Sequence, residues 1–141
     1  MILLDTNVLS EPLKLKSDAA VLAWMDAQTI ETLFLSAISL AELRFGIATL
    51  PAGRRKDDLH ANFERRILPL FVGRILVFDT AASEAYAILR ASARAEGKAI
   101  APADGYLAAT AIVHDLSVAT RDTSPFLAAG LTVINPWDAS S

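Results

Sequence analysis

The sequence has no cysteine, no long apolar run and no excess of positive charge. Without cysteine, the chain has no disulfide, no zinc–thiolate site and no thiol nucleophile. No apolar run approaches the roughly 18 residues that a membrane span needs. The apolar start has no basic residues and stops at Asp5, so it predicts a strand rather than a signal peptide. We therefore expect a cytoplasmic protein that does not contact a membrane.

Lys and Arg number 13 against 16 Asp and Glu, which gives a net charge of −3. Proteins that coat nucleic acids are usually basic. A nuclease remains compatible with this balance, because a divalent-metal site uses several carboxylates and a few local Lys and Arg residues can contact phosphates. The hydrophobic content of 53% is ample for one core and favours a further surface buried against a partner.

Short apolar runs alternate with segments of helical periodicity along the whole chain. The runs that we expect to form strands are residues 2–4, 32–35, 75–78, 116–120 and 131–134. Helices are expected over residues 18–28, from Ser39 to about 50, over 55–72, after a cap at Asp79 or Thr80, and from Pro102. Continuously apolar strands that alternate with helices predict an α/β fold, a three-layer α/β/α sandwich with a central parallel sheet. No linker or repeat is visible, so residues 1–141 are predicted to form a single domain.

Four carboxylates fall where ligands gather in such a sheet, at the carboxyl ends of the strands. Asp5 directly follows the first strand, and Asp122 follows the fourth by two residues. Glu42 is expected in the first turn of the helix after the second strand. Asp104 is expected in the first turn of the helix that precedes the fourth strand. The four side chains are therefore predicted to meet at one edge of the sheet.

Carboxylates gathered at one edge repel one another unless a cation binds among them. Oxygen ligands suit Mg²⁺ or Mn²⁺. Such an ion promotes hydrolysis of a phosphodiester bond by holding phosphate and activating water. His60 and His114 lie far from these positions in the sequence, so no competing nucleophile is evident.

Each carboxylate also has a purely structural interpretation. Asp5 and Asp122 follow strands, where Asp often serves in a turn or loop. Ser39 and Glu42 have the spacing of a capping box at a helix start, and Asp104 would interact favourably with a helix dipole. Asp79 is predicted to cap a helix and is not assigned to the site.

Three groups of basic residues have two open interpretations. They are Arg90, Arg94 and Lys98 at four-residue spacing, Arg54 to Lys56, and the pair Arg65 and Arg66. Each group is either a solvated helix face or part of a track that binds the RNA backbone through salt-dependent phosphate contacts.

Five segments, in order, resemble the motifs of PIN domains, and most closely the VapC-type toxins of bacterial toxin–antitoxin pairs. Residues 3–10 (LLDTNVLS) resemble the opening motif, and residues 39–46 (SLAELRFG) the second. Residues 104–111 (DGYLAATA) resemble the third and 119–122 (ATRD) the fourth. Residues 133–137 (VINPW) resemble the C-terminal end of the FitB-like branch.

The resemblance implies a PIN fold and an endoribonuclease that depends on Mg²⁺ or Mn²⁺. It implies inhibition by a small VapB-type antitoxin, contact with DNA only through that antitoxin, and a homodimer. Carried over, the acidic site that holds metal and catalyses cleavage comprises Asp5, Glu42, Asp104 and Asp122. The polar residues around it would be Thr6, Asn7, Ser10 and Thr120. The position of Asp122 is often Asn in the family, and Arg121 would contact phosphate or neutralise the cluster.

Two other functions remain open. One is a PIN-like binding or regulatory module without turnover that acts through its partner protein. The other is a small-molecule phosphatase with a strand-end aspartate nucleophile, which needs a second Asp where this chain has Asn7.

Overall fold

The computed structural model describes residues 1–138, in which five parallel strands form one sheet. The strand order is β3-β2-β1-β4-β5, so β1 lies at the centre. The strands are β1 (Ile2–Leu4), β2 (Leu33–Ser36), β3 (Ile75–Leu76), β4 (Ser117–Ala119) and β5 (Val133–Ile134). Leu3 of β1 pairs in register with Phe34 of β2 and with Val118 of β4. The predicted α/β sandwich with a parallel sheet is confirmed.

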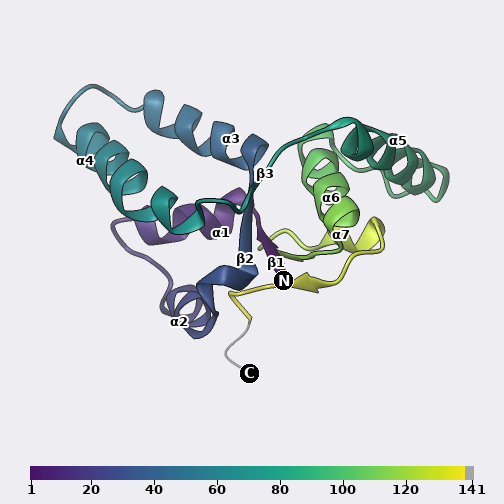
Figure 1. Ribbon diagram of the computed structural model, residues 1–141, viewed down its shortest axis with the longest axis horizontal. Coiled ribbons are helices and arrows are strands. Elements are labelled where there is room, and N and C mark those ends of the chain that lie inside the picture. The colour runs from purple at the N-terminus through teal and green to yellow at the C-terminus, as the bar shows by residue number, and fades with distance from the viewer. Residues whose placement is uncertain (139–141) are drawn as a thin grey trace.

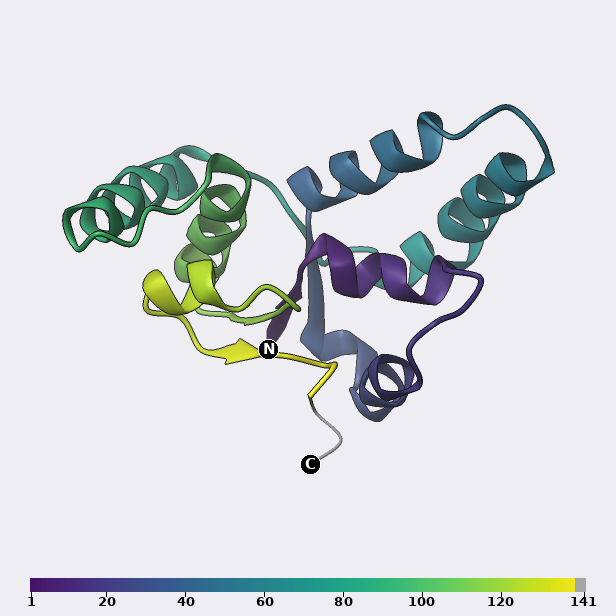
Figure 2. The same ribbon diagram turned by 180° about the vertical axis from the view of Figure 1, so that it is seen from behind.

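Helices cover both faces of the sheet, as Figure 1 shows. The α-helices are α1 (Thr6–Ser10), α2 (Ala19–Ala27), α3 (Ala37–Ala48), α4 (Arg54–Asn62), α5 (Thr80–Ala95), α6 (Pro102–His114) and α7 (Ser124–Ala128). Shorter helical segments are η1 (Glu11–Leu13), η2 (Ile30–Thr32), the π-helical η3 (Phe63–Ile67) and η4 (Leu68–Phe71). Seen from behind in Figure 2, α1 to α4 form one arm of the molecule and α5 to α7 the other.

Two consecutive residues of β1 show how the sheet divides the core. Leu3 and Leu4 are both fully buried, and in a strand they point to opposite faces. Leu3 packs with Leu89 of α5 and with residues of α6. Leu4 packs on the other face with Val8 of α1 and Leu43 of α3. Burial on both faces explains why the strands are continuously apolar.

Within the arm formed by α5 to α7, α5 packs closely on α6, and one glycine allows this at the start of α6. A Cβ atom added at Gly105 would stand 2.9 Å from the Tyr86 ring and 3.0 Å from Arg90 Cδ. Arg90 is fixed there, because its guanidinium donates to the Ile100 carbonyl and the Tyr86 hydroxyl. Gly105 therefore lets α5 approach α6 directly beside Asp104.

Several predicted boundaries were wrong. The helix predicted over 55–72 is divided into α4, η3 and η4, because Pro69 lacks an amide hydrogen for a continuous α-helix. The strands predicted over 75–78, 116–120 and 131–134 are shorter, and α1 and α7 were not predicted. The predicted end of the domain at residue 141 lies outside the described residues. None of the helices in the described part of the chain has the length and apolar character that a bilayer crossing requires.

Candidate active site

Asp5 occupies the carboxyl end of the central strand and begins α1. Its amide donates to the Ala119 carbonyl of β4 at 2.9 Å, which fixes its backbone to the neighbouring strand. Its Oδ1 accepts from the Thr6 amide at 2.7 Å, so the side chain caps α1. The structural role proposed for Asp5 is therefore real, and it leaves the second carboxylate oxygen free to face the end of β4.

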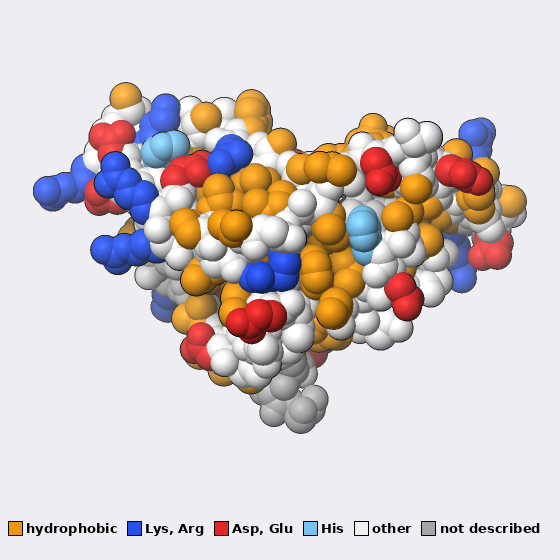
Figure 3. All heavy atoms as spheres, in the orientation of Figure 1, with side chains coloured by type: hydrophobic (Ala, Val, Ile, Leu, Met, Phe, Trp, Pro, Cys, Tyr) orange, Lys and Arg blue, Asp and Glu red, His pale blue; other side chains and the backbone are white. Residues whose placement is uncertain are grey.

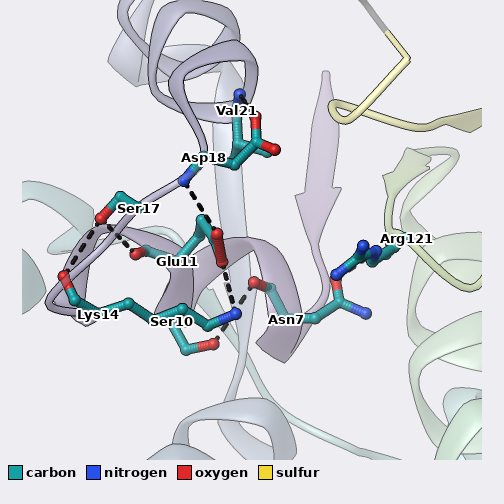
Figure 4. Close-up of polar contacts among 8 residues, drawn as sticks. All are labelled: Asn7, Ser10, Glu11, Lys14, Ser17, Asp18, Val21 and Arg121. Carbon is teal, nitrogen blue, oxygen red and sulfur yellow. Dashed lines mark hydrogen bonds and ion pairs between the residues drawn. The ribbon is translucent and has the colours of Figure 1, made fainter.

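Thr120 connects the Oδ2 atom of Asp5 to the other polar residues of the site. The buried Thr120 hydroxyl donates to Asp5 Oδ2 at 2.8 Å. Thr120 Oγ1 also accepts from the Asp122 amide at 3.1 Å and from Asn7 Nδ2 at 3.4 Å. Asn7 Oδ1 in turn accepts from the Arg121 amide at 3.3 Å, as Figure 4 shows. One hydroxyl thus holds the end of β1 and the end of β4 together.

Glu42 lies on α3, but not where the sequence predicted. The cap of α3 is Ser36, whose hydroxyl accepts from the amides of Ile38 and Ser39, at 3.1 and 3.3 Å. The helix therefore begins before Ser39, and Glu42 falls beyond its first turn. The predicted position of Glu42 in the first turn was therefore wrong, and the alternative interpretation of Ser39 and Glu42 as a capping box is wrong as well. The carboxylate of Glu42 is left available for another role.

Asp104 lies in the first turn of α6, as predicted. Pro102 is the first residue of this helix, and the preceding Ala101 offers no side chain to cap it. Asp104 is half-buried. Its side chain does not cap α6 through a hydrogen bond to a backbone amide, as the side chain of Asp5 does at α1. At the helix start its negative charge interacts favourably with the helix dipole, as the alternative interpretation required.

The four carboxylates lie close enough to influence one another electrostatically. The pKa of Asp5 is raised by burial, against the lowering effect of its hydrogen bonds to Thr120 and Thr6, and is raised further by Asp122. Burial raises the pKa of Glu42, with added repulsion from Asp5 and Asp104. Burial also raises the pKa of Asp104, and Asp5 and Asp122 add to the effect. The structure thus brings together the four residues that the sequence grouped.

No positive side chain neutralises this acidic group. Among residues 1–138, none of the four carboxylates forms an ion pair with Lys or Arg. The Arg121 guanidinium lies over the Trp137 ring at 5.0 Å and does not neutralise the cluster. No set of three or more His, Asp and Glu side chains in the same residues has the geometry of a metal site.

The donor set nevertheless has the chemistry that Mg²⁺ or Mn²⁺ requires. Its four members supply only oxygen ligands. Asp5 and Asp122 follow β1 and β4, whereas Glu42 and Asp104 come from α3 and α6, which belong to the two helical arms (Figure 1). The Thr6 hydroxyl beside Asp5 is buried and has no hydrogen-bond partner among the described residues. A groove of about 290 Å³ exposes Thr6 and Ser10 to the same space as Glu42. This buried hydroxyl lacks a hydrogen-bond partner and lies next to carboxylates that repel one another. Such an arrangement suits a site for a cation and its bound water.

A buried carboxylate next to this site, that of Glu11, was not predicted from the sequence. Glu11, at 3% exposure, follows α1 and bonds to Lys14 Nζ at 2.9 Å and to the Asp18 amide at 3.1 Å (Figure 4). Ser10 lies at the same turn, and its hydroxyl donates to the Asn7 carbonyl at 3.4 Å. The three-residue spacing of Glu11 and Lys14 was the only available signal. The pair holds an ammonium group at the groove that contains Glu42.

Replacement of Thr120 by Val is expected to lower the free energy of unfolding by about 1–3 kcal/mol. The substitution keeps the shape but removes the hydroxyl that serves Asp5, Asn7 and the Asp122 amide. Chemical denaturation of the metal-free protein measures the effect. The matched control is Thr110→Val, because the Thr110 hydroxyl is also buried but only donates to the Tyr106 carbonyl within α6. Equal losses in both variants would contradict the role assigned to Thr120.

Comparison with known proteins agrees with this arrangement. The PIN domain family matches residues 2–130. VapC ribonuclease Y4jK of Sinorhizobium fredii is 59% identical over 138 residues, which cover 98% of this chain and 99% of that protein. Toxin FitB of Neisseria gonorrhoeae is 55% identical over 137 residues, which cover 97% of this chain and 99% of that protein.

The fold agrees equally well with a solved structure. The crystal structure of FitAcB from Neisseria gonorrhoeae superposes with a TM-score of 0.95 at 54% identity, and covers 98% of this chain and 99% of that one. Family match, sequence relatives and structure all extend over nearly the same residues. The chain therefore belongs to the PIN-domain family, and its relatives place it with the VapC and FitB proteins of that family.

Proposed function

We propose that this protein is a metal-dependent endoribonuclease and acts as the toxin of a toxin–antitoxin pair. The observation that carries the proposal is a group of four carboxylates from separate elements that has no cationic partner among residues 1–138, and in which burial and neighbouring carboxylates raise the pKa of Asp5, Glu42 and Asp104. A group of this kind is costly unless it binds a cation. The name of the S. fredii relative, a VapC ribonuclease, supports the choice of RNA as the substrate.

The residues divide the work according to their positions. Asp5 and Asp104 would hold the divalent cation, with Asp122 as a further ligand of the metal or of a water. Glu42, which is free of the capping role, would hold the cation or orient the attacking water. Thr120 keeps Asp5 Oδ2 in place through its 2.8 Å hydrogen bond.

A bound Mg²⁺ or Mn²⁺ would supply Lewis acidity toward a phosphate oxygen and lower the pKa of a coordinated water. The acidic residues would orient an attacking water in line with the scissile phosphodiester bond. The oxygen of this water adds to phosphorus, and a carboxylate of the site accepts the proton that the water releases. The bond from phosphorus to the 3′ oxygen breaks, and that oxygen takes up a proton from solvent as it leaves. The products are a 5′-phosphate and a 3′-hydroxyl.

We further propose a VapB-type antitoxin as the protein partner and a homodimer as the assembled form of the toxin. Exposed apolar side chains on the arm formed by α5 to α7 support the dimer. Among them are Ile88 of α5, at 62% exposure, and Leu127 of α7, at 59%. Contact with DNA is assigned to the antitoxin, because the net charge of this chain is −3. A cytoplasmic location follows from an RNA substrate.

The deciding experiment is cleavage of a mixed labelled RNA by purified, partner-free protein. Cuts are expected with Mn²⁺ or Mg²⁺, and none with EDTA or with the Asp104→Asn variant. A correctly folded protein that binds Mn²⁺ but cuts none of a diverse set of RNAs would instead indicate a binding module without turnover. Release of phosphate from a simple monoester, without RNA cleavage, would indicate a small-molecule phosphatase.

A further inference from the structure

A groove lined by arginines lies beside the candidate active site. It has a volume of about 850 Å³ and runs between α4 with η3 on one side and the segment after η1 on the other. Arg54, Arg55, Arg65 and Arg66 all line it. In Figure 3, Lys and Arg side chains gather at this end of the molecule.

These four arginines are free to meet a ligand. Among residues 1–138 none of them forms an ion pair, and the nearby Glu64 is already bound by Arg44 at 2.8 Å. Residues 54–66 contain five Lys and Arg against three Asp and Glu, although the whole chain has a net charge of −3. Residues 54–66 therefore carry a net charge of +2, and four arginines line the groove against one carboxylate, Asp58.

The arginine groove adjoins a smaller groove that reaches the Glu42 side of the acidic site. The smaller groove, of about 290 Å³, shares Leu13, Arg55 and Leu59 with it, and is also lined by Thr6 and Glu42. Lys14, held by buried Glu11, lines the same smaller groove. A polymer that lies in the arginine groove can therefore extend along the surface to Glu42.

The second group of basic residues is only partly available. Arg90 is bound to Tyr86 and to the Ile100 carbonyl, and its guanidinium lies 5.2 Å from the Tyr86 ring centre. It therefore serves the packing of α5, whereas Arg94 on α5 and Lys98 after that helix are exposed. Lys98 lines a separate groove of about 530 Å³ with Asp104, but no arginine among residues 1–138 lines that groove. The larger group of cations is therefore the one in the groove beside α4.

We propose that the arginine groove binds the phosphate backbone of the RNA strand whose scissile bond lies at the acidic site. The inference rests on the proposed function, since a nuclease site explains why a path of cations leads to a group of carboxylates. Guanidinium groups bind phosphates through paired, charge-assisted hydrogen bonds. The arginines lie in the groove beside the acidic site and contact phosphates. They therefore position the RNA strand without recognising particular bases.

The test measures binding of a labelled single-stranded RNA of mixed sequence in EDTA, where cleavage does not interfere. The variant Arg54→Gln/Arg66→Gln removes a cation at each end of the groove. Its matched control, Lys56→Gln/Arg94→Gln, removes the same charge at positions that do not line the groove. Melting temperatures of both variants establish that the fold is intact.

The groove variant is expected to bind RNA roughly tenfold more weakly than the control, with a salt dependence smaller by about 1.4 in log–log slope, or about 0.7 for each lost phosphate contact. Equal affinities and slopes in the two variants, or no salt-dependent binding by the wild type, overturn the proposal. So does a loss of poly-glutamate binding with unchanged RNA binding, which would assign the groove to an acidic protein segment. If the wild type binds RNA through the groove but does not cut it with Mn²⁺, the proposed function fails and the groove assignment stands.

Discussion

Replacement of Asp5 by Asn is expected to lower the rate of RNA cleavage about a thousandfold or more while the protein remains folded. Asn keeps an oxygen that can accept from the Thr6 amide, so the cap of α1 survives. The substitution removes the negative charge at the residue that affects the pKa of both Glu42 and Asp104. A metal held by the remaining carboxylates loses its central ligand, and the cleavage rate at saturating Mn²⁺ measures that loss.

The matched control for this prediction is Asp79→Asn. Asp79 also follows a strand and caps a helix, since its Oδ1 accepts from the Ala82 amide at 2.9 Å. It belongs to neither the acidic group nor the grooves beside it. Cleavage by Asp79→Asn should therefore match the wild type. A similar loss of activity in both variants would mean that helix capping, rather than metal binding, explains the effect at Asp5.

The location of the candidate site was predictable because it depends on the strands. Asp5 and Asp122 follow buried apolar runs, and parallel strands bring their carboxyl ends to one edge whatever the details of the helices. The prediction for Glu42 reached the correct place from a wrong helix start. Ser36 and Ser39 are both plausible caps for the helix after β2. The sequence alone does not decide which serine lies next to the unpaired backbone amides at the helix start.

Features that depend on tertiary packing were not predictable. The apolar periodicity from 55 to 72 gives no sign of the transition from α4 to the π-helical η3, which contains Arg65 and Arg66 of the groove. Glu11 appears in the sequence as an ordinary surface residue after a turn. Its burial results from the approach of the α2 start, where the Asp18 amide needs an acceptor. Nothing local in the sequence encodes that approach.

The metal-free protein is expected to lose stability as the pH rises from about 4 toward 7, and Mn²⁺ is expected to restore it. The pKa values of Asp5, Glu42 and Asp104 are raised in the folded state. Between the unfolded and folded pKa values the native chain therefore holds more protons than the unfolded chain. Unfolding releases protons in this range, so a higher pH favours the unfolded state. Above the folded pKa values the loss is complete.

Mn²⁺ at about a hundred times its dissociation constant should add about 2.7 kcal/mol at pH 7, or roughly 10 °C in melting temperature. Thermal melts across pH, with EDTA and with Mn²⁺, measure both effects. Asp104→Asn should melt higher than the wild type in EDTA at pH 7, because it relieves repulsion, and should gain less from Mn²⁺. Asp26→Asn removes an equal charge from the exposed face of α2 and should do neither. If Asp104→Asn behaves like Asp26→Asn, the four carboxylates do not act as one cation-binding group. If it loses only the Mn²⁺ response, repulsion among the carboxylates is relieved by protein contacts rather than by metal.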